Sequence, residues 1–267
     1  MPERSGYASG TPCWVELSST DVALSAGFYR ELFGWEAMFD SDPDQGGYGR
    51  FTCEGRLVAG ITLAACRTVP AMWNVYIAVD DAAATLEEVR AAGGEVVLEP
   101  MQIMDRGVMA AFQDPTGAFL SIWQRMSDFG AEVTVEPGAF GWVELSARDP
   151  AVALSFYPRV FGWEPREHGT GRRRYVEWYL GDRRVAGMAP MGPDIPADVP
   201  SQWRTYFVVE DAEATVAKVR ELGGKVFTEP LSTYGGPLAV LADPEFAVFA
   251  ILQLDPSLVP PSQPPPS

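Results

Sequence analysis

The chain repeats one pattern over nearly its whole length. The stretch 13–21 reads CWVELSSTD, and residues 141–149 read GWVELSARD. Later landmarks return at a similar spacing: Phe28-Tyr29 and Phe156-Tyr157, Gly34-Trp35-Glu36 and Gly162-Trp163-Glu164, Val58-Ala59-Gly60 and Val185-Ala186-Gly187, Asp114-Pro115 and Asp243-Pro244. Because the spacing changes by only a few positions over each half, the pattern indicates a duplicated domain with small loop insertions.

Two domains also suit the length of 267 residues, of which 47% are hydrophobic, enough for a core in each half. We expect a short N-terminal segment at 1–12, domains at 13–125 and 140–255, and a linker at 126–139. The linker contains the Gly, Pro and acidic residues typical of a connector. Residues 256–267 are rich in proline and are expected to form a disordered tail.

The charge balance argues against two classes of partner. Twenty basic and thirty-six acidic residues give a net charge of −16, which repels nucleic acid and anionic membranes alike. Neither a spanning apolar segment nor a signal peptide is evident, so a cytoplasmic protein is expected. Cys13, Cys53 and Cys66 lack CxxC spacing, which argues against a disulfide framework and a thiolate metal cluster.

Each half shows the same order of elements. Residues 14–19 alternate as a half-buried strand, Asp21 offers a helix N-cap, and 22–33 carry one apolar helical face that Gly34 can end. Short strands follow. A second strand, a second helix ending at a Gly-Gly pair and three more strands complete the half. The sequence therefore predicts two βαβββ units in each half, an α+β fold.

This ordered set, present twice, resembles the vicinal oxygen chelate superfamily. That superfamily includes glyoxalase I, extradiol dioxygenases, fosfomycin-resistance enzymes and bleomycin-resistance proteins, and the chain is similar to its two-domain glyoxalase-like members in actinobacteria. The resemblance implies two tandem domains, each an open β-sheet cup with its helices outside. It also implies that a ligand or a metal ion sits in each cup.

The metal-ligand positions implied by the resemblance hold poor ligands. They fall on Trp14, Asn74 and Ser121 in the first half and on Trp142, Arg204 and Ala250 in the second. The chain has one histidine, His168, which lies in a loop-like stretch and is expected at the surface. We therefore expect neither a metal nor another cofactor.

Strand alternation predicts which side chains share the cup face with these positions. In the first half the cup would hold Trp14, Glu16, Asn74, Tyr76, Ser121 and Trp123, and in the second Trp142, Glu144, Arg204 and Tyr206. Aromatic side chains with a few polar groups are typical of small-molecule sites. The alternative is that the aromatic rings only close each cup as core.

A carboxylate inside an apolar cup needs a physical explanation, because its burial is costly unless it is neutral, hydrogen-bonded or paired. Glu16 and Glu144 could accept hydrogen bonds from a neighbouring Tyr hydroxyl and order the strand, bind a ligand donor, or act as acid or base with a raised pKa. A weak metal site on either is a further alternative. Arg204 could pair with Glu144, whereas Asn74 offers Glu16 only an amide, so Glu16 is expected to be the more proton-active.

Three functions remain open from the sequence. The first is metal-independent binding of a small aromatic or polycyclic natural product, with a role in antibiotic resistance or biosynthesis. The second is a cofactor-free isomerase, cyclase or hydratase with Glu16 as general base assisted by Tyr76, and with Glu144 as the matching candidate. The third is a metal-dependent lyase or dioxygenase. The sequence leaves open whether the chain is a monomer or a homodimer.

Overall fold

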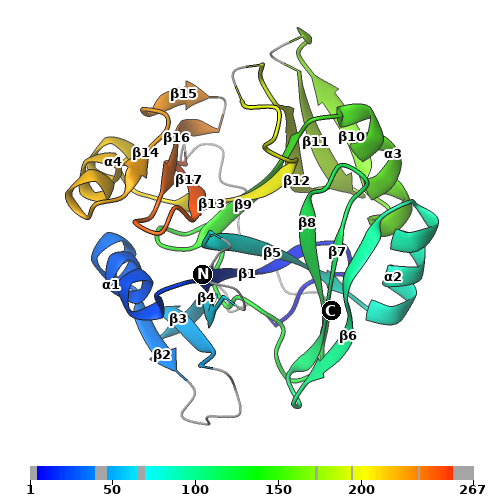
Figure 1. The fold of residues 1–267 in the computed structure, drawn as a ribbon, viewed down its shortest axis with the longest axis horizontal. Helices are drawn as coiled ribbons and strands as arrows, with labels where there is room; N and C mark the ends of the chain where they lie inside the picture. Colours follow the sequence, from blue (N-terminus) through cyan, green and yellow to red (C-terminus); the bar gives the residue numbers. More distant parts are fainter. Residues whose placement is uncertain are drawn as a thin grey trace.

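The computed structural model describes residues 5–39, 47–64, 70–171, 174–193, 195–233 and 235–254. The expected tail at 256–267 and the side chain of Cys66 lie outside these residues. Within this part of the chain, two open β-sheets, one from each half, pack together with four helices (Figure 1). No helix in the described part of the chain is long and apolar enough to cross a membrane.

The first half builds an eight-stranded sheet in the order β2-β3-β4-β1-β5-β8-β7-β6. Its elements are β1 (Pro12–Ser19), α1 (Val22–Phe33), β2 (Glu36–Phe39), β3 (Gly49–Cys53), β4 (Arg56–Leu63), β5 (Met72–Val79), α2 (Ala82–Ala91), β6 (Glu95–Ile103), β7 (Gly107–Gln113) and β8 (Phe119–Arg125). The central strand β1 runs parallel to β4 and antiparallel to β5. This order confirms the two βαβββ units expected in the half.

The second half builds the matching sheet in the order β10-β11-β12-β9-β13-β17-β16-β14, with β15 paired to β16. Its elements are β9 (Phe140–Ala147), α3 (Pro150–Phe161), β10 (Glu164–His168), β11 (Tyr175–Leu180), β12 (Arg183–Pro190), β13 (Gln202–Val208), α4 (Ala212–Glu221), β14 (Lys225–Val226), β15 (Leu231–Thr233), β16 (Gly236–Ala242) and β17 (Val248–Leu252). Each sheet therefore comes from one half of the chain.

Local chemistry sets the helix bounds where the sequence predicts them. The Asp21 carboxylate accepts a hydrogen bond from the Leu24 backbone N–H at 3.1 Å and so caps the start of α1. Gly34 ends the helix in the left-handed conformation, at φ 71°, and its N–H bonds to the Arg30 carbonyl. Asp149 and Gly162 repeat both caps on α3.

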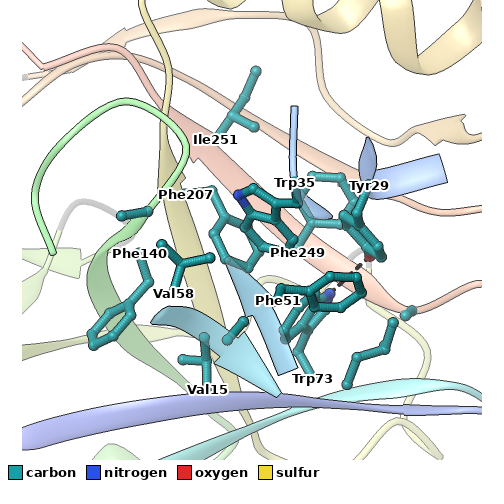
Figure 2. Packing of buried hydrophobic residues seen from close by; sticks show 14 of the residues in the cluster. Val15, Tyr29, Trp35, Phe51, Val58, Trp73, Phe140, Phe207, Phe249 and Ile251 are labelled. Atoms are coloured by element: carbon teal, nitrogen blue, oxygen red, sulfur yellow. Dashed lines mark hydrogen bonds between the residues drawn. The ribbon is translucent and has the colours of Figure 1, made fainter. Parts of the chain in front are cut away.

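The two halves share their hydrophobic cores. Helix α1 lies beside α4 and helix α2 beside α3, so each helix pair joins a unit of one half to a unit of the other (Figure 1). In one shared core Tyr29, Trp35 and Trp73 of the first half pack against Phe207 and Phe249 of the second (Figure 2). The sheet faces that carry the helices thus form the interface between the domains.

A buried hydrogen-bond triad sits in each shared core. The Tyr29 hydroxyl lies 3.1 Å from a carboxylate oxygen of Asp243 and accepts the indole N–H of Trp73 at 2.9 Å. The other core repeats it with Tyr157, Asp114 and Trp203, at 2.7 Å and 2.9 Å. Each triad joins the Phe-Tyr pair of one half to the Asp-Pro turn of the other, so these repeated motifs stabilise the domain interface.

The connecting segments are tied to the same interface. The indole N–H of Trp35 donates to the Gly138 carbonyl at 2.7 Å, and that of Trp163 donates to the Gly10 carbonyl at 2.7 Å. Both tryptophans are fully buried. The repeated Gly-Trp motif therefore anchors the segment that precedes the first strand of the opposite domain.

Candidate functional site

The first cup is centred on Glu16 in the middle of β1. Glu16 is 9% exposed, and its Oε1 accepts the hydroxyl of Tyr76 from β5 at 3.1 Å. Tyr48, one residue before β3, is a second hydrogen-bond partner of Glu16 and also bonds to Trp14. The cup therefore holds one carboxyl group between two phenols. A hydrogen bond from a Tyr hydroxyl to Glu16 is one of the alternatives that the sequence left open.

Gly60 makes room for this cluster. It lies on β4 directly beside Glu16 in the parallel ladder. A Cβ atom at position 60 would meet the Tyr48 hydroxyl at 2.7 Å and the Trp14 indole nitrogen at 3.0 Å. The absence of a side chain at this position allows the Tyr48 hydroxyl and the Trp14 indole nitrogen to lie close to Glu16.

Burial changes the acidity of the cluster. It raises the pKa of Glu16 from 4.5 to about 7, although the hydrogen bonds from Tyr76 and Tyr48 partly oppose this change. Burial, and then the neighbouring Glu16 charge, raise the pKa of both phenols well above 10. Glu16 therefore exchanges its proton near neutral pH, while the two tyrosines stay protonated and serve as donors.

The second cup repeats the arrangement. Glu144 Oε1 accepts the Tyr206 hydroxyl at 2.8 Å, and Tyr175 is its second partner. The Trp142 indole N–H donates to the Tyr175 hydroxyl at 3.0 Å. Gly187, beside Glu144 in the ladder, again leaves the space for the Tyr175 hydroxyl and the Trp142 indole nitrogen. Burial raises the pKa of Glu144, and the charge of Arg204 acts most strongly against that rise.

One position differs between the cups. Asn74 stands opposite Glu16 on β5, and Arg204 stands opposite Glu144 on β13. The amide oxygen of Asn74 and the Nε of Arg204 are both buried with no hydrogen-bond partner. A buried polar atom without a partner is costly, so each is a place for a ligand or a water to bind.

A cleft of about 260 Å³ lies between β3 and the linker, somewhat smaller than the roughly 300–1,000 Å³ typical of small-molecule sites. Its lining includes Arg50, Arg106, Asp128 and Phe129. Arg50 pairs with Gly60, which in turn pairs with Glu16, so Arg50 projects from the same face of the sheet as Glu16. The cleft therefore lies beside β3 and the linker, and Trp14, Glu16 and Tyr76 are not among the residues that line it.

The linker covers one expected lining residue. The indole N–H of Trp123 donates to the Asp128 carbonyl at 2.8 Å. Phe129 packs on Tyr7 with ring centroids 6.3 Å apart. Ser121, 1% exposed, is a hydrogen-bond partner of Tyr76. Ser121 thus belongs to the cluster around Glu16, whereas Trp123 lies where β8 meets the linker.

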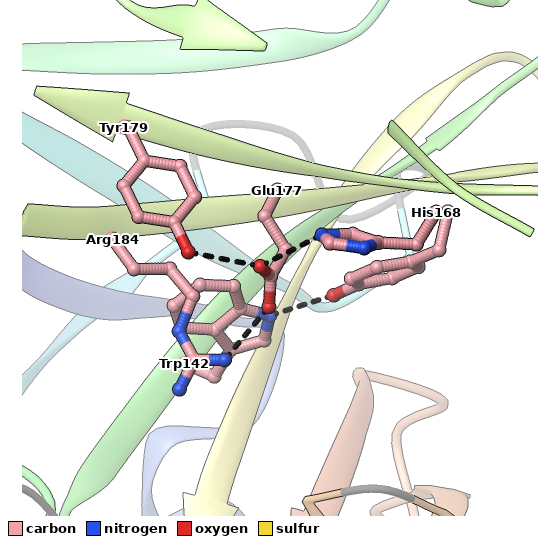
Figure 3. A network of polar contacts seen from close by, with 6 residues as sticks. Trp142, His168, Glu177, Tyr179 and Arg184 are labelled. Carbon is pink, nitrogen blue, oxygen red and sulfur yellow. Dashed lines mark hydrogen bonds and ion pairs between the residues drawn. The ribbon is translucent and has the colours of Figure 1, made fainter. Parts of the chain in front are cut away.

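A charged network lines β10 to β12 of the second sheet (Figure 3). Glu177 accepts hydrogen bonds from Arg184 at 2.7 Å and Tyr179 at 3.0 Å, and lies 3.1 Å from His168. The Arg184 guanidinium lies over the Trp142 ring at 5.2 Å. His168 ends strand β10 rather than lying in a loop, and its side chain is 56% exposed, as expected for a surface residue.

The structure thus brings together most of the candidates from the sequence. Trp14, Glu16, Tyr76 and Ser121 meet in the first cup with Asn74 opposite Glu16, and the second cup joins the four candidates of that half: Trp142, Glu144, Arg204 and Tyr206. Sequence reasoning missed Tyr48 and Tyr175. The signal was present, because Tyr175 follows Tyr48 by 127 positions, the same spacing that relates Gly60 to Gly187.

The donor set of the cups does not fit a divalent metal ion. Each cluster offers one carboxyl group, held by two phenols, beside a tryptophan. Among the described residues, no three His, Cys, Asp or Glu side chains lie close enough together to share a metal. Phenols with a raised pKa and an indole are poor ligands for the metals that carboxylate and imidazole sites hold.

Comparison with known proteins agrees with this architecture. The chain is 41% identical over 262 residues to the anthracycline biosynthesis protein DnrV of Streptomyces peucetius, covering 93% of this chain and 94% of DnrV. It is 40% identical to CFP32 of Mycobacterium bovis, which bears the provisional name of a glyoxylase, over 95% of this chain and 98% of CFP32.

Among solved structures, the Mn(II)-bound glyoxalase of Novosphingobium aromaticivorans matches with a TM-score of 0.64 at 17% identity, over 95% of this chain and 84% of that one. At this identity the match shows the fold alone. The family model of the Glyoxalase/Bleomycin resistance protein/Dioxygenase superfamily matches residues 13–122 and again 139–246. The chain belongs to this superfamily, with one copy of its domain in each half.

Proposed function

We propose that the chain binds a flat, hydroxyl-bearing aromatic small molecule in its cups without the help of a metal. The observation that supports this most directly is the duplicated cluster, in which a Glu, two Tyr and a Trp converge on one face of each sheet. Beside each cluster lies a buried polar atom without a partner. Aromatic walls with a few convergent polar groups and a carboxyl of raised pKa are features of ligand sites.

The ligand class follows from the chemistry of the first cup. The Asn74 amide oxygen is an acceptor without a donor, so a phenolic hydroxyl group, which has one O–H to donate, complements it. DnrV, the relative that is 41% identical, is named an anthracycline biosynthesis protein. A role in the biosynthesis or sequestration of a related aromatic natural product fits this chemistry.

Fluorescence titration tests the proposal. The protein is titrated with 2-naphthol and with hydroxylated anthraquinones while tryptophan emission is recorded. We expect saturable quenching that becomes smaller in Trp14→Phe and in Trp142→Phe, because each variant removes the reporter of one cup. Trp178→Phe, which alters a ring buried in the domain interface, serves as the matched control. A complete lack of saturable binding by the whole panel would contradict the proposal.

A second function, proton transfer at carbon, is favoured by one specific observation. Glu16 has a pKa raised to about 7 by burial, which suits a general base or acid at neutral pH. Tyr76 and Tyr48 would then donate hydrogen bonds to the same carboxyl and set its orientation. A bound ketone with an acidic neighbouring C–H is the class of substrate that such a base can act on.

Deuterium exchange tests this second function. The protein is incubated with 1-tetralone in D2O, and incorporation next to the carbonyl is followed by proton NMR. We expect faster exchange with the wild type than with buffer alone, and a loss of about 100-fold or more in Glu16→Gln, because general base catalysis contributes roughly 10²–10⁴-fold. Equal exchange by wild type and Glu16→Gln would remove Glu16 from the role of base.

A further inference from the structure

The two cups differ in the buried atom that lacks a hydrogen-bond partner. In the first cup it is an acceptor, the amide oxygen of Asn74, and in the second it is a donor, the Nε of Arg204. We propose that the second cup selects an aromatic ligand that carries a carboxylate, which Arg204 binds, whereas the matching position of the first cup selects a hydroxyl group. This inference rests on the proposed binding function and adds the ligand chemistry of each cup. Its basis is the exchange of Asn74 for Arg204 at one position of the duplicated site.

The free atom of Arg204 has the geometry that carboxylate recognition uses. Arginine binds carboxylates with two parallel N–H donors, and the side-on form of this fork uses Nε together with one terminal nitrogen. The Nε of Arg204 is buried and has no hydrogen-bond partner. Arg204 also bonds to the hydroxyl of Tyr206, which fixes its side chain beside Glu144. The guanidinium is therefore held in place with one inner donor unused.

The other charged groups of the second cup leave this donor available. Glu144, the carboxyl nearest to Arg204, already accepts the hydroxyls of Tyr206 and Tyr175. On the β11 side, Glu177 and Arg184 neutralise each other in an ion pair of 2.7 Å. A ligand carboxylate at Arg204 would thus meet an N–H donor without a hydrogen bond, next to a Glu144 carboxyl group that two phenols hold and with which the charge of Arg204 interacts.

The first cup has the opposite arrangement. Asn74 presents an unpartnered acceptor beside Glu16, and the arginine of that cup, Arg50, lies on the other side of Gly60 on β3. The residue that matches Arg50 in the second cup is Glu177, which pairs with Gly187. The matching positions therefore hold Asn74 and Arg50 in the first cup but Arg204 and Glu177 in the second, so the two cups offer different charges on each side of the central Glu.

Calorimetric titration of the full chain with 2-naphthoate and 2-naphthol tests the inference. The two probes share their ring system and differ in carboxylate against hydroxyl. We expect Arg204→Gln to weaken 2-naphthoate binding about 10- to 100-fold, which is the range for a lost charge-assisted hydrogen bond. Binding of 2-naphthol should change by less than about threefold. Arg204→Lys should lie between the wild type and Arg204→Gln, because an ammonium group keeps the charge without the planar fork.

Arg30→Gln is the control for the change in net charge, because Arg30 is an exposed arginine on α1, away from the described cups. It should leave both affinities unchanged. The inference is wrong if Arg204→Gln and Arg204→Lys both bind 2-naphthoate as tightly as the wild type. It is also wrong if the two variants lose affinity for 2-naphthoate and for 2-naphthol by the same factor. In either case the proposed binding function stands. If the wild type binds neither probe, the proposed function and the inference both fail.

Discussion

At the scale of single residues, the environment of Glu16 departs strongly from that of an ordinary carboxyl group in water. It lies on a central strand among aromatic side chains, and the two groups that hold it are phenols rather than cations. Phenols stabilise the charged form only partly, so burial dominates its pKa. Glu144 differs because Arg204 stands beside it. The same motif therefore produces two carboxyl groups of different acidity.

The raised pKa of Glu16 predicts how stability depends on pH. The folded state holds the proton up to about pH 7, whereas the unfolded state releases it near 4.5, so the free energy of unfolding falls as pH rises through this window. Between pH 4.5 and 8 the wild type should lose about 3 kcal/mol more than Glu16→Gln, which does not titrate. Urea unfolding at a series of pH values measures the difference, and parallel pH curves would contradict it.

At the scale of secondary-structure elements, glycines on β4 and β12 decide the shape of the two clusters. Each glycine stands beside the Glu of its own half in the parallel ladder, at Gly60 and Gly187. Strands pack their neighbours at a fixed spacing of about 4.8 Å, so a side chain here would occupy the space that Tyr48 or Tyr175 fills. The duplicated glycine is thus a requirement of the site rather than of the sheet.

Substitution of this glycine tests its role. Gly60→Ala places a methyl group 2.7 Å from the Tyr48 hydroxyl, so Tyr48 must move away from Glu16. We expect at least a tenfold loss of 2-naphthol affinity in the first cup and a cost of about 1–3 kcal/mol in folding stability. Gly27→Ala, in α1 with no neighbouring atom within 4 Å, should keep ligand affinity and gain up to about 1 kcal/mol. Equal behaviour of the two variants would contradict this account.

The elements themselves were largely predictable from the sequence. The α1 bounds at residues 22–33 follow from Asp21 and Gly34, which act locally. Alternation along β1 correctly placed Trp14 and Glu16 on one face because strand geometry is also local. Tyr48 and Tyr175 escaped prediction because each lies on or just before a strand that is not adjacent to the strand of its Glu, and strand alternation does not show which strands meet. The contact of Trp123 with the linker depends on a chain path that no local pattern encodes.

At the scale of the whole molecule, the duplication is also a requirement for folding. Each half exposes the helix-bearing face of its sheet to the other half, and both cores contain residues from both halves. The sequence showed the repeated Phe-Tyr, Gly-Trp and Asp-Pro motifs but not their purpose, because their partners lie in the other half of the chain, between 43 and 214 residues away. In the structure they join the domains through the Tyr29 and Tyr157 triads.

Glu245 adds a polar contact that holds the domains together. Its carboxylate accepts the hydroxyls of Ser19 and Ser25 at 2.6 and 2.5 Å and the backbone N–H of Thr20 at 3.0 Å. Burial acts to raise its pKa, but these bonds outweigh it, so the pKa of Glu245 is lowered. A lowered folded-state pKa stabilises the protein above the unfolded pKa near 4.5, and this stability is lost as pH falls.

Glu245→Gln should therefore destabilise the protein by about 1–2 kcal/mol at pH 7, because hydrogen bonds to a charged acceptor become bonds to a neutral one. The difference should shrink as the pH falls below 4.5. Thermal unfolding of both proteins at pH 7 and pH 3.5 measures it. Glu229→Gln, which removes an exposed carboxylate beside Arg220, is the matched control and should change stability by less than about 1 kcal/mol. A constant or growing difference at low pH would contradict the assignment.

The most direct test of the account is the titration of Glu16 itself. Protein labelled with ¹³C at the glutamate carboxyl is followed by NMR across pH 3 to 9, and the Glu16 signal is identified by its loss in Glu16→Gln. The burial of Glu16 predicts a titration midpoint close to 7, well separated from the midpoints of the exposed glutamates. A Glu16 midpoint near 4.5 would show that the carboxyl group is solvated and charged, and would contradict the proposed ligand-binding centre.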